Sequence, residues 1–589
     1  MAKAGEIIRK KKKYGDEEIE VIYRKLKDRP EPGASARAAL AEGRQPIHML
    51  DGFGDFPELN PRTYKVCPGI LCEQDVEIVM RDGVKTYGDI YRPEGQTDIP
   101  VIISWSWFGK RPCADSRDAE YQTFGVPFGS HSKHTKFEGP DPEYWCHKGY
   151  AVLNYDFRGV NNSEGDIEMT TEQEAIDGYD VVEFLARLPW CNGKIGMAGN
   201  SGLAIAQWKT ASAKPPHLAC IAPWEGNTDN FREMTCMGGI PECGFNPHLT
   251  SMLYGRGYME DTFLMTQEYP LINAFWEDKY CKFENIDIPC YVTSGWCHFH
   301  NRGSFEGFNK IKSKQKWLRV HRDFEWPDQY HKESLADLTD FFDRYLKGIR
   351  NGWESTPTIR IDVMDAYDCD FLLKRAEETF PLERTIYKRL WLNAEDKSLN
   401  REQAEKASKC TYDAKTGRAT FDMAFEEETE ITGYMKLRLW VEADGSDDMD
   451  LFVAIQKLDK DGKWLPTYIL GKPHPGAAGK LRVSMRELDP EKTTDYKPYY
   501  TFKSFRKLSP GERVPVDIEI WPTSRIWHAG EQIRVEVMGH YERIDWFEPF
   551  DYNTFNNGTH IIHTGGEYDS YLQIPVIPPK YKSAGKVYY

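Results

Sequence analysis

The sequence predicts an α/β domain with a mostly parallel sheet, a helical segment inserted into it, and a separate C-terminal β-sandwich. Between residues 66 and 355, apolar strands alternate with helices that carry an apolar stripe, a pattern typical of a parallel sheet covered on both faces. Residues 224–284 interrupt this alternation and are rich in Met, Phe, Tyr and Gly. Beyond residue 356 the apolar period falls to two, which indicates antiparallel strands packed as a sandwich.

The first domain follows a regular order of strands and helices. Its opening hairpin turns at Asp82-Gly83, a favoured two-residue turn sequence. The later strands are continuous apolar runs, as expected where both faces of a sheet are buried. The expected strands are 76–80, 99–105, 150–156, 194–198, 288–294 and 317–320. The expected helices are 171–188, which begins with a capping box at Thr171 and Glu174, a helix that starts at Leu203, and 335–346.

These changes of pattern divide the chain into five segments. They are an N-terminal arm (1–65), the first part of the α/β domain (66–223), a helical cap (224–284), the second part of the α/β domain (285–355) and a jelly-roll β-sandwich (356–589). The arm is polar, and we expect it to be partly helical. Its basic run at residues 9–13 is followed at once by acidic residues, so we interpret the run as a solvated helix end.

Composition excludes several classes of protein. The 589 residues carry a net charge of −16, which argues against nucleic acid as the main partner. There is no run of 18 apolar residues and no apolar leader, so we expect neither a transmembrane helix nor a secretory signal. The 13 cysteines are scattered without metal-finger spacing, which predicts free thiols in the cytoplasm and no metal site. Exposed edge strands in the sandwich are compatible with a homodimer.

Ser201 stands where a catalytic nucleophile is expected in an α/β-hydrolase fold. The sequence Gly199-Asn200-Ser201-Gly202 lies between an expected strand and an expected helix, which is the strand-turn-helix context of a nucleophile elbow. The N-terminus of that helix would direct backbone N–H groups, first that of Gly202, at a developing oxyanion. The motif departs from G-x-S-x-G because position 203 is Leu. Trp224 follows the next strand and could line the acyl pocket.

Several further stretches give the chain a family resemblance. They are 155–160 with 163–165, 196–201, 222–224, 302–304, 325–328, 345–348, 520–524, 558–560 and 563–566. With these stretches the chain resembles the cocaine esterase / X-Pro dipeptidyl-peptidase family of serine hydrolases over roughly residues 74–577. The resemblance implies three parts: a hydrolase fold, a helical cap inserted after the nucleophile helix, and a C-terminal jelly-roll. It also implies hydrolysis of an ester or amide through an acyl-enzyme, without a metal or organic cofactor.

The sequence departs from the family pattern at three positions that carry chemistry. The family places its acid where this chain has His298, and its histidine base where this chain has Asp323. The family's oxyanion tyrosine corresponds to Phe108, which has no hydroxyl to donate. The indole N–H of Trp105 or Trp107 could replace that donor. We therefore expect a rearranged site rather than the usual one.

In the first interpretation the triad is rebuilt around Ser201. His298, His300 or His321 would be the base, and Asp323 or Glu325 would orient it, because a triad is defined by geometry and roles. We favour His298, since it stands at the C-terminal end of an expected strand, where such sheets place active residues. A base should lie within about 2.6–3.2 Å of Ser201 Oγ.

In the second interpretation the same pocket performs another reaction. Loss of one oxyanion donor would cost on the order of 10²–10³ in rate if nothing replaced it. The chain would then be a lyase, an acyltransferase or a catalytically silent binding protein. In each case we expect a small-molecule ligand, because the cap carries Met234, Met237 and Met265, residues suited to an adaptable apolar pocket.

Overall fold

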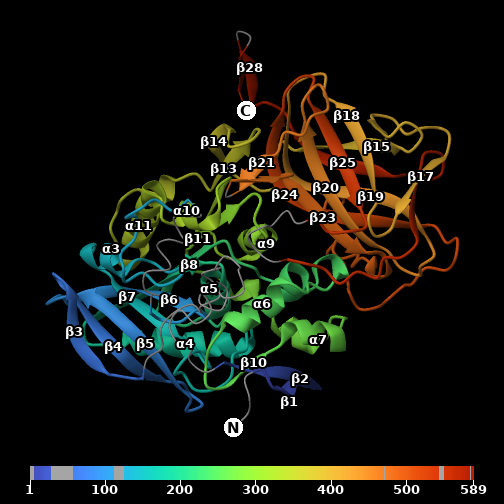
Figure 1. Ribbon diagram of the computed structural model, residues 1–589. Coiled ribbons are helices and arrows are strands. Elements are labelled where there is room, and N and C mark those ends of the chain that lie inside the picture. Colours follow the sequence, from blue (N-terminus) through green and yellow to red (C-terminus); the bar gives the residue numbers. More distant parts are fainter. Residues whose placement is uncertain are drawn as a thin grey trace, which may run out of the picture.

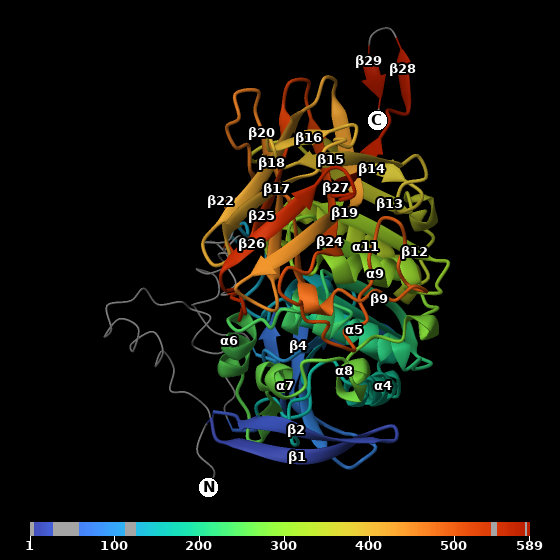
Figure 2. The same ribbon diagram turned by 90° about the vertical axis from the view of Figure 1, so that its right-hand side faces the viewer.

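The computed structural model of the protein describes residues 5–27, 58–111, 125–469, 471–542, 550–583 and 586–588 (Figure 1). An α/β body with its helical cap forms one half of the molecule, and a β-sandwich forms the other. Figure 2 shows the sandwich at one end and an N-terminal hairpin at the opposite end, beneath the cap helices. Among the described residues, no helix combines the length and apolar character needed to cross a bilayer.

The α/β body is built on one continuous sheet. In spatial order its strands are β3 (Arg62–Cys67), β4 (Ile70–Val79), β5 (Lys85–Pro93), β7 (Ala151–Asp156), β6 (Ile99–Ser106), β8 (Cys191–Asn200), β9 (Leu218–Trp224), β11 (Cys290–Gly295), β12 (Lys316–His321), β13 (Ile359–Met364) and β14 (Asp370–Glu377). The strands from β7 to β13 run parallel, and the outer strands run antiparallel. The predicted hairpin at Asp82-Gly83 is confirmed. β13 and β14 extend this sheet beyond residue 355, before the chain enters the sandwich.

Helices cover both faces of the sheet, as the alternating pattern predicts. They are α3 (Pro142–His147), α4 (Glu172–Ala186), α5 (Gly202–Ser212), α9 (Asn301–Lys310), α10 (Glu325–Gln329) and α11 (Lys332–Leu346). The core under α11 and α3 includes Ile102 and Phe342, while the core on the other face includes Ile103 and Phe305. Thr171 is the N-cap of α4, and its Oγ1 accepts a hydrogen bond from the Glu174 N–H at 3.3 Å.

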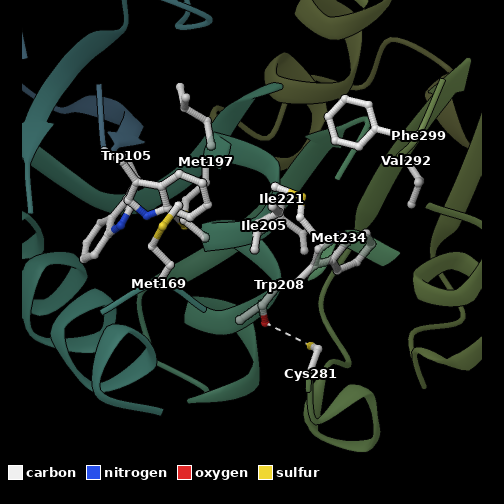
Figure 3. Packing of buried hydrophobic residues seen from close by; sticks show 14 of the residues in the cluster. Trp105, Met169, Met197, Ile205, Trp208, Ile221, Met234, Cys281, Val292 and Phe299 are labelled. Carbon is white, nitrogen blue, oxygen red and sulfur yellow. Dashed lines mark hydrogen bonds between the residues drawn. The ribbon is translucent and has the colours of Figure 1, made fainter. Parts of the chain in front are cut away.

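The segment between β9 and β11 is the helix-rich cap that the sequence predicts. It contains η2 (Phe231–Thr235), η3 (Met237–Gly239), α6 (Phe245–Met252), β10 (Tyr258–Glu260), α7 (Thr262–Glu268), α8 (Ala274–Asp278) and η4 (Phe283–Asn285). Figure 3 shows how Ile205 and Trp208 of α5 lie between sheet residues and the cap residues Met234 and Cys281. The Cys281 thiol donates a hydrogen bond to the Trp208 carbonyl at 3.5 Å. The cap is therefore packed directly on the helix that follows Ser201.

The N-terminal arm is a β-hairpin over its described residues, so the helical expectation was wrong there. β1 (Ile7–Tyr14) pairs with β2 (Glu17–Lys25), and β2 pairs with β10 of the cap. Four residues of β2 are buried: Ile19, Val21, Ile22 and Tyr23. Alternate lysines of the basic run pair with acidic residues of the α/β body, Lys10 with Asp166 and Lys12 with Glu168. The burial of β1 alternates along the strand, but its run of basic residues gives the sequence no matching alternation of apolar and polar residues. Residues 28–57 lie outside the described part.

The C-terminal domain is a mostly antiparallel β-sandwich. Its strands are β15 (Ile386–Asn393), β16 (Ser398–Asn400), β17 (Ser408–Asp413), β18 (Arg418–Ala424), β19 (Thr429–Asp444), β20 (Asp450–Leu458), β21 (Thr467–Ile469), β22 (Lys472–His474), β23 (Ala477–Arg482), β24 (Val514–Trp527), β25 (Gln532–Met538), β26 (Thr559–Thr564) and β27 (Tyr571–Ile577). The long strand β19 pairs with β24, β26 and β27. β18, β25, β20 and β23 form the other layer. A last hairpin, β28 (Tyr581–Ser583) and β29 (Lys586–Tyr588), projects from the sandwich (Figure 1).

Candidate active site

Ser201 lies at a strained turn between β8 and α5. Its φ of 51° and ψ of −120° place a non-glycine residue in a sparsely populated backbone region. A Cβ atom added at Gly199 would lie 2.5 Å from Leu203 Cδ2, and one added at Gly202 would lie 2.9 Å from the Trp107 ring. Only glycine therefore fits on both sides of this turn. The geometry is that of a nucleophile elbow, which exposes the serine hydroxyl above the sheet.

His300 and Asn227 complete a hydrogen-bonded chain with Ser201. Ser201 Oγ lies 3.0 Å from His300 Nε2, and His300 Nδ1 lies 2.8 Å from Asn227 Oδ1. Ser201 follows β8, Asn227 follows β9 and His300 follows β11, and these three strands are adjacent in the sheet. Sequence analysis named His300 as one of three candidates and missed Asn227. The signal for Asn227 was its place just after the strand next to the serine strand.

The surroundings of His300 fix its protonation. The amide nitrogen of Asn227 donates to Met234 Sδ at 3.0 Å, an assignment that leaves Oδ1 to accept from His300 Nδ1. The proton then sits on Nδ1, and the lone pair of Nε2 faces the Ser201 hydroxyl. Burial, and then the charge of neighbouring His298, lower the pKa of His300 well below its ordinary value of 6.5. His300 is therefore a neutral imidazole, able to accept a proton, at neutral pH.

The structure corrects the preference for His298 as the partner of Ser201. His298 lies between two buried carboxylates, with Nδ1 3.4 Å from Glu225 Oε2 and Nε2 3.8 Å from Glu325 Oε1. The backbone N–H of His300 donates to His298 Nδ1 at 3.3 Å. The chain turns for five residues after β11 before α9 begins, and this turn brings His300 rather than His298 over the serine. Glu325 pairs with His298, whereas the histidine that bonds to Ser201 is His300.

His321 and Asp323 also lie apart from the serine chain. His321 Nε2 is 3.0 Å from Glu225 Oε1 and 3.1 Å from Asp328 Oδ2. Burial opposes protonation of His321, but the carboxylates of Asp328 and Glu225 outweigh it and raise its pKa. The side chain of Asp323 is 57% exposed and pairs with Arg322, so its carboxylate does not orient a histidine. The expected role of Asp323 is thus corrected, because only its backbone carbonyl contacts His321, at 3.0 Å.

The N–H groups that the sequence suggests as oxyanion donors differ in whether they already form hydrogen bonds in the structure. The N–H of Gly202 lies at the first turn of α5, where the fold provides one donor. The Trp105 indole is excluded as the second, because its N–H donates to Glu174 Oε1 at 3.0 Å. The indole nitrogen of Trp107 is buried and has no hydrogen-bond partner among the described residues. Phe108 packs edge-on against Trp107.

Trp224 does not line a pocket beside the serine, contrary to expectation. Its side chain is buried in the core on the α11 face of the sheet, where its ring contacts Tyr291 and lies under Arg319. Its backbone carbonyl, with that of Glu225, accepts a hydrogen bond from the Ser201 N–H, at 3.1 and 2.9 Å. Trp224 therefore contributes to the site by anchoring the elbow to the end of β9.

A metal could in principle be held beside the serine. Ligand atoms of His298, His300 and Glu325, all buried, lie within 4.8 Å of one another, and imidazole and carboxylate suit several divalent metals. Both ring nitrogens of His300 already form hydrogen bonds, to Ser201 and Asn227. A metal here would have to displace one of these contacts, so the hydrogen-bonded chain and a metal site are alternatives.

A pocket lined by aromatic, apolar and charged side chains adjoins the site, next to His298 and Phe299. Its other lining residues come from the cap, the α/β body and the sandwich, and include Met237, Arg232, Trp296, Arg302, Tyr499, Phe502, Glu519 and Trp521. Of the cap methionines expected to form an apolar pocket, Met237 lines this one. Met234 and Met265 are buried in hydrophobic cores.

The fold and the elbow define an α/β-hydrolase with a C-terminal β-sandwich. Residues 82–262 match the X-Pro dipeptidyl-peptidase (S15 family), and residues 351–573 match the X-Pro dipeptidyl-peptidase C-terminal non-catalytic domain. The structure of a CocE/NonD family hydrolase from Staphylococcus aureus is 36% identical, with a TM-score of 0.82 over 86% of this chain and 94% of that chain. The chain therefore belongs to the CocE/NonD family of hydrolases, and the resemblance predicted from sequence is confirmed.

Other relatives are more distant or matched over less of their length. Cocaine esterase from a Rhodococcus species is 31% identical over 158 residues, which is 27% of this chain and 24% of that protein. The chain thus matches about a quarter of the length of this curated relative. The structure of an α-amino acid ester hydrolase is 17% identical, has a TM-score of 0.63, covers 88% of this chain and 99% of its own, and shares the fold.

Proposed function

We propose that this protein is a serine hydrolase that cleaves a small ester or amide through an acyl-enzyme on Ser201. The observation that carries the proposal is the chain of hydrogen bonds from Ser201 Oγ through His300 to Asn227. His300 Nε2 would take the hydroxyl proton as Oγ attacks the substrate carbonyl, and would then return it to the leaving group. The N–H groups of Gly202 and Trp107 would stabilise the oxyanion. Water repeats the sequence on the acyl-enzyme.

The neutral partner of His300 favours esters over amides. An aspartate would stabilise the imidazolium that forms during attack, whereas Asn227 holds the ring orientation without a countercharge. Burial further disfavours the imidazolium. The missing countercharge therefore slows the hydrolysis of amides, which are less reactive, more than the hydrolysis of esters. We propose an ester of a small alcohol or phenol as the preferred substrate class.

A fluorophosphonate probe tests the proposal directly. We expect one adduct per chain, located on Ser201 by peptide mass spectrometry, and none on the Ser201→Ala variant. Turnover of a p-nitrophenyl ester should disappear in step with labelling, and should exceed turnover of the matching p-nitroanilide. Ester hydrolysis that survives complete labelling of Ser201, or an intact protein that takes up no label, would show that Ser201 is not the nucleophile.

The pH dependence should report the depressed pKa of His300. The base must be neutral to act, and its folded pKa lies well below 6.5 because of burial and His298. We expect kcat/KM to stay constant as the pH falls through 6.5 and to decline only at lower pH, since kcat/KM reports groups of the free enzyme. Stopped-time assays over the pH range in which the fold is intact check this. The acid limb is the fall of kcat/KM at low pH, and a midpoint of this limb at or above pH 6.5 would contradict the expectation.

The Trp107 indole should contribute to the rate as an oxyanion donor. Replacing it by Phe keeps a flat ring against Gly202 but removes the buried N–H. We expect kcat to fall about 10²-fold with little change in KM, as for loss of one such donor. Trp105→Phe is the matched control, because its indole bonds to Glu174 instead. Equal effects of the two changes on kcat would assign Trp107 to packing alone.

We also propose that the enzyme works on small molecules in the cytoplasm. Support comes from the negative net charge and from the cysteines of the described residues, which are free thiols. Such thiols are typical of reducing compartments.

A further inference from the structure

Arg302 occupies a junction of the three parts of the protein. It lies two residues after His300, in the first turn of α9, and its side chain is 3% exposed. Its Nη1 donates to Glu233 Oε1 of the cap at 2.7 Å. Its Nε donates to both carboxylate oxygens of Glu519 on β24 of the sandwich, at 3.1 and 3.2 Å. One guanidinium therefore joins the helix that begins at His300 to the cap and to the sandwich.

The cap carboxylate in this junction holds the loop that presents Asn227. Glu233 Oε2 accepts hydrogen bonds from the backbone N–H groups of Thr228 and Asp229, at 2.7 and 3.1 Å. These are the two residues that follow Asn227. Through Glu233, Arg302 thus connects the element that carries His300 with the loop that carries its hydrogen-bond partner.

The same loop and helix are packed without spare room. A Cβ atom added at Gly303 would lie 2.6 Å from the Gly226 carbonyl oxygen and 2.7 Å from Asn227 Cα. Ser304 Oγ donates to the His300 carbonyl at 3.2 Å and accepts from the Gly226 N–H at 3.4 Å. Glycine at 303 permits the close approach, and the Arg302–Glu233 ion pair joins the same helix and loop.

The sandwich side of the junction is itself fixed. The Glu519 N–H donates to the Tyr500 hydroxyl at 2.9 Å, and that hydroxyl donates to the Asp517 carbonyl at 2.7 Å. The side chain of Glu519 is 11% exposed. A planar guanidinium can bond two carboxylates that approach from different directions, whereas a lysine ammonium is a point charge without this fork.

We propose that Arg302 is a positioning residue that holds His300 in register with Asn227 and Ser201, and that Glu519 makes this register depend on the β-sandwich. The inference rests on the proposed function, because it assigns His300 the role of base. The inference gives the sandwich a role in catalysis, although the sandwich contributes no residue to the hydrogen-bonded chain of Ser201, His300 and Asn227. A misplacement of about 1 Å in such a chain can cost about 100-fold in rate.

The test compares Arg302→Lys and Glu519→Gln with wild type, using the full chain and a p-nitrophenyl ester. We expect kcat to fall about 100-fold in Arg302→Lys, with KM changed little, and by a smaller factor in Glu519→Gln. We also expect the acid limb of kcat/KM to move to higher pH, because a looser contact admits water and relieves the burial that depresses the pKa of His300. Simple loss of folded protein would lower the rate without moving this limb.

A buried ion pair elsewhere in the sandwich provides the control. Arg482 pairs with Asp450 at 2.7 Å, and both side chains are at most 2% exposed. Arg482→Lys should lower the melting temperature and leave kcat and the acid limb unchanged. If folded Arg302→Lys and Glu519→Gln also keep the wild-type kcat and acid limb, the proposal is overturned.

Two further outcomes are separated by the same set of variants. If Arg302→Lys does not fold, Glu519→Gln alone tests the inference, because glutamine has the shape of glutamate and the variant keeps the contact between Arg302 and Glu233 of the cap. An acid limb that does not move in Glu519→Gln overturns the inference. If Ser201→Ala keeps its ester turnover, the proposed function fails instead, whatever the Arg302 variants do.

Discussion

Ser201→Ala and His300→Ala should each lower kcat for a p-nitrophenyl ester by about 10⁶-fold, because nucleophile and base act as one unit. Ser201 Oγ and His300 Nε2 lie 3.0 Å apart, so removal of either leaves the other without a partner in the attack. The double variant should therefore be no slower than either single variant. Turnover per folded chain, with the uncatalysed rate subtracted, measures all three.

Two controls separate loss of the base from loss of a buried ring. The first control is His560→Ala. His560 is a fully buried histidine of the sandwich, and its Nδ1 lies 3.2 Å from the Tyr412 hydroxyl. This variant should lower stability and leave kcat unchanged. Added imidazole should restore part of the activity of His300→Ala and none of that of Ser201→Ala. His298→Ala should retain much more activity than His300→Ala. If His298→Ala lost more activity than His300→Ala, His298 rather than His300 would be the base.

Much of the fold could be predicted because its signals are local. Buried parallel strands appear as continuous apolar runs, and the helices between them carry a stripe that matches the faces observed in the core. The hairpin at residues 7–25 was missed for a physical reason. Its lysines are paired with acidic residues of a distant segment, so a strand that is neutralised in the folded state looks like a solvated, helical charge run in the sequence.

The site could be predicted only in part, because turns rather than helices or strands bring His300 and Asn227 to Ser201. The position of Ser201 follows from strand, small residues and helix in immediate succession. His300 instead depends on the path of five residues between β11 and α9, which no periodicity describes. Asn227 depends on the order of strands in space, since β9 lies between β8 and β11. A search for polar residues after each of these three strands would have found it.

His298, which stands at the position that the family resemblance assigns to the acid, belongs to a separate buried network. Glu225, with a φ of 53°, lies between His298 at 3.4 Å and His321 at 3.0 Å, and Asp328 pairs with His321 and Arg319. Charges so enclosed are costly unless paired. The network therefore has a structural basis of its own. Residue types alone pointed to His298, which belongs to this network, rather than to His300, which bonds to Ser201.

Asn227→Ala should lower kcat about 10⁴-fold, which is the scale of losing the correct tautomer of a catalytic histidine. Without Oδ1, nothing holds the proton on Nδ1, and the ring of His300 is free to present N–H rather than a lone pair to Ser201. Labelling by fluorophosphonate should slow by a similar factor. Asn556→Ala is the matched control, because Asn556 is a buried amide of the sandwich that donates to the Asp450 carbonyl at 2.8 Å.

Asn227→Asp separates orientation from charge at the same position. An aspartate keeps an acceptor for His300 Nδ1 and adds a negative charge, which raises the pKa of His300 from its depressed value. The acid limb of kcat/KM should then move to higher pH, while kcat above that limb should equal or exceed that of wild type, because the imidazolium gains a countercharge. Equally severe loss of activity in folded Asn227→Asp and Asn227→Ala would show that an acceptor for His300 Nδ1 is not what Asn227 contributes, and would overturn the orienting role proposed for Oδ1.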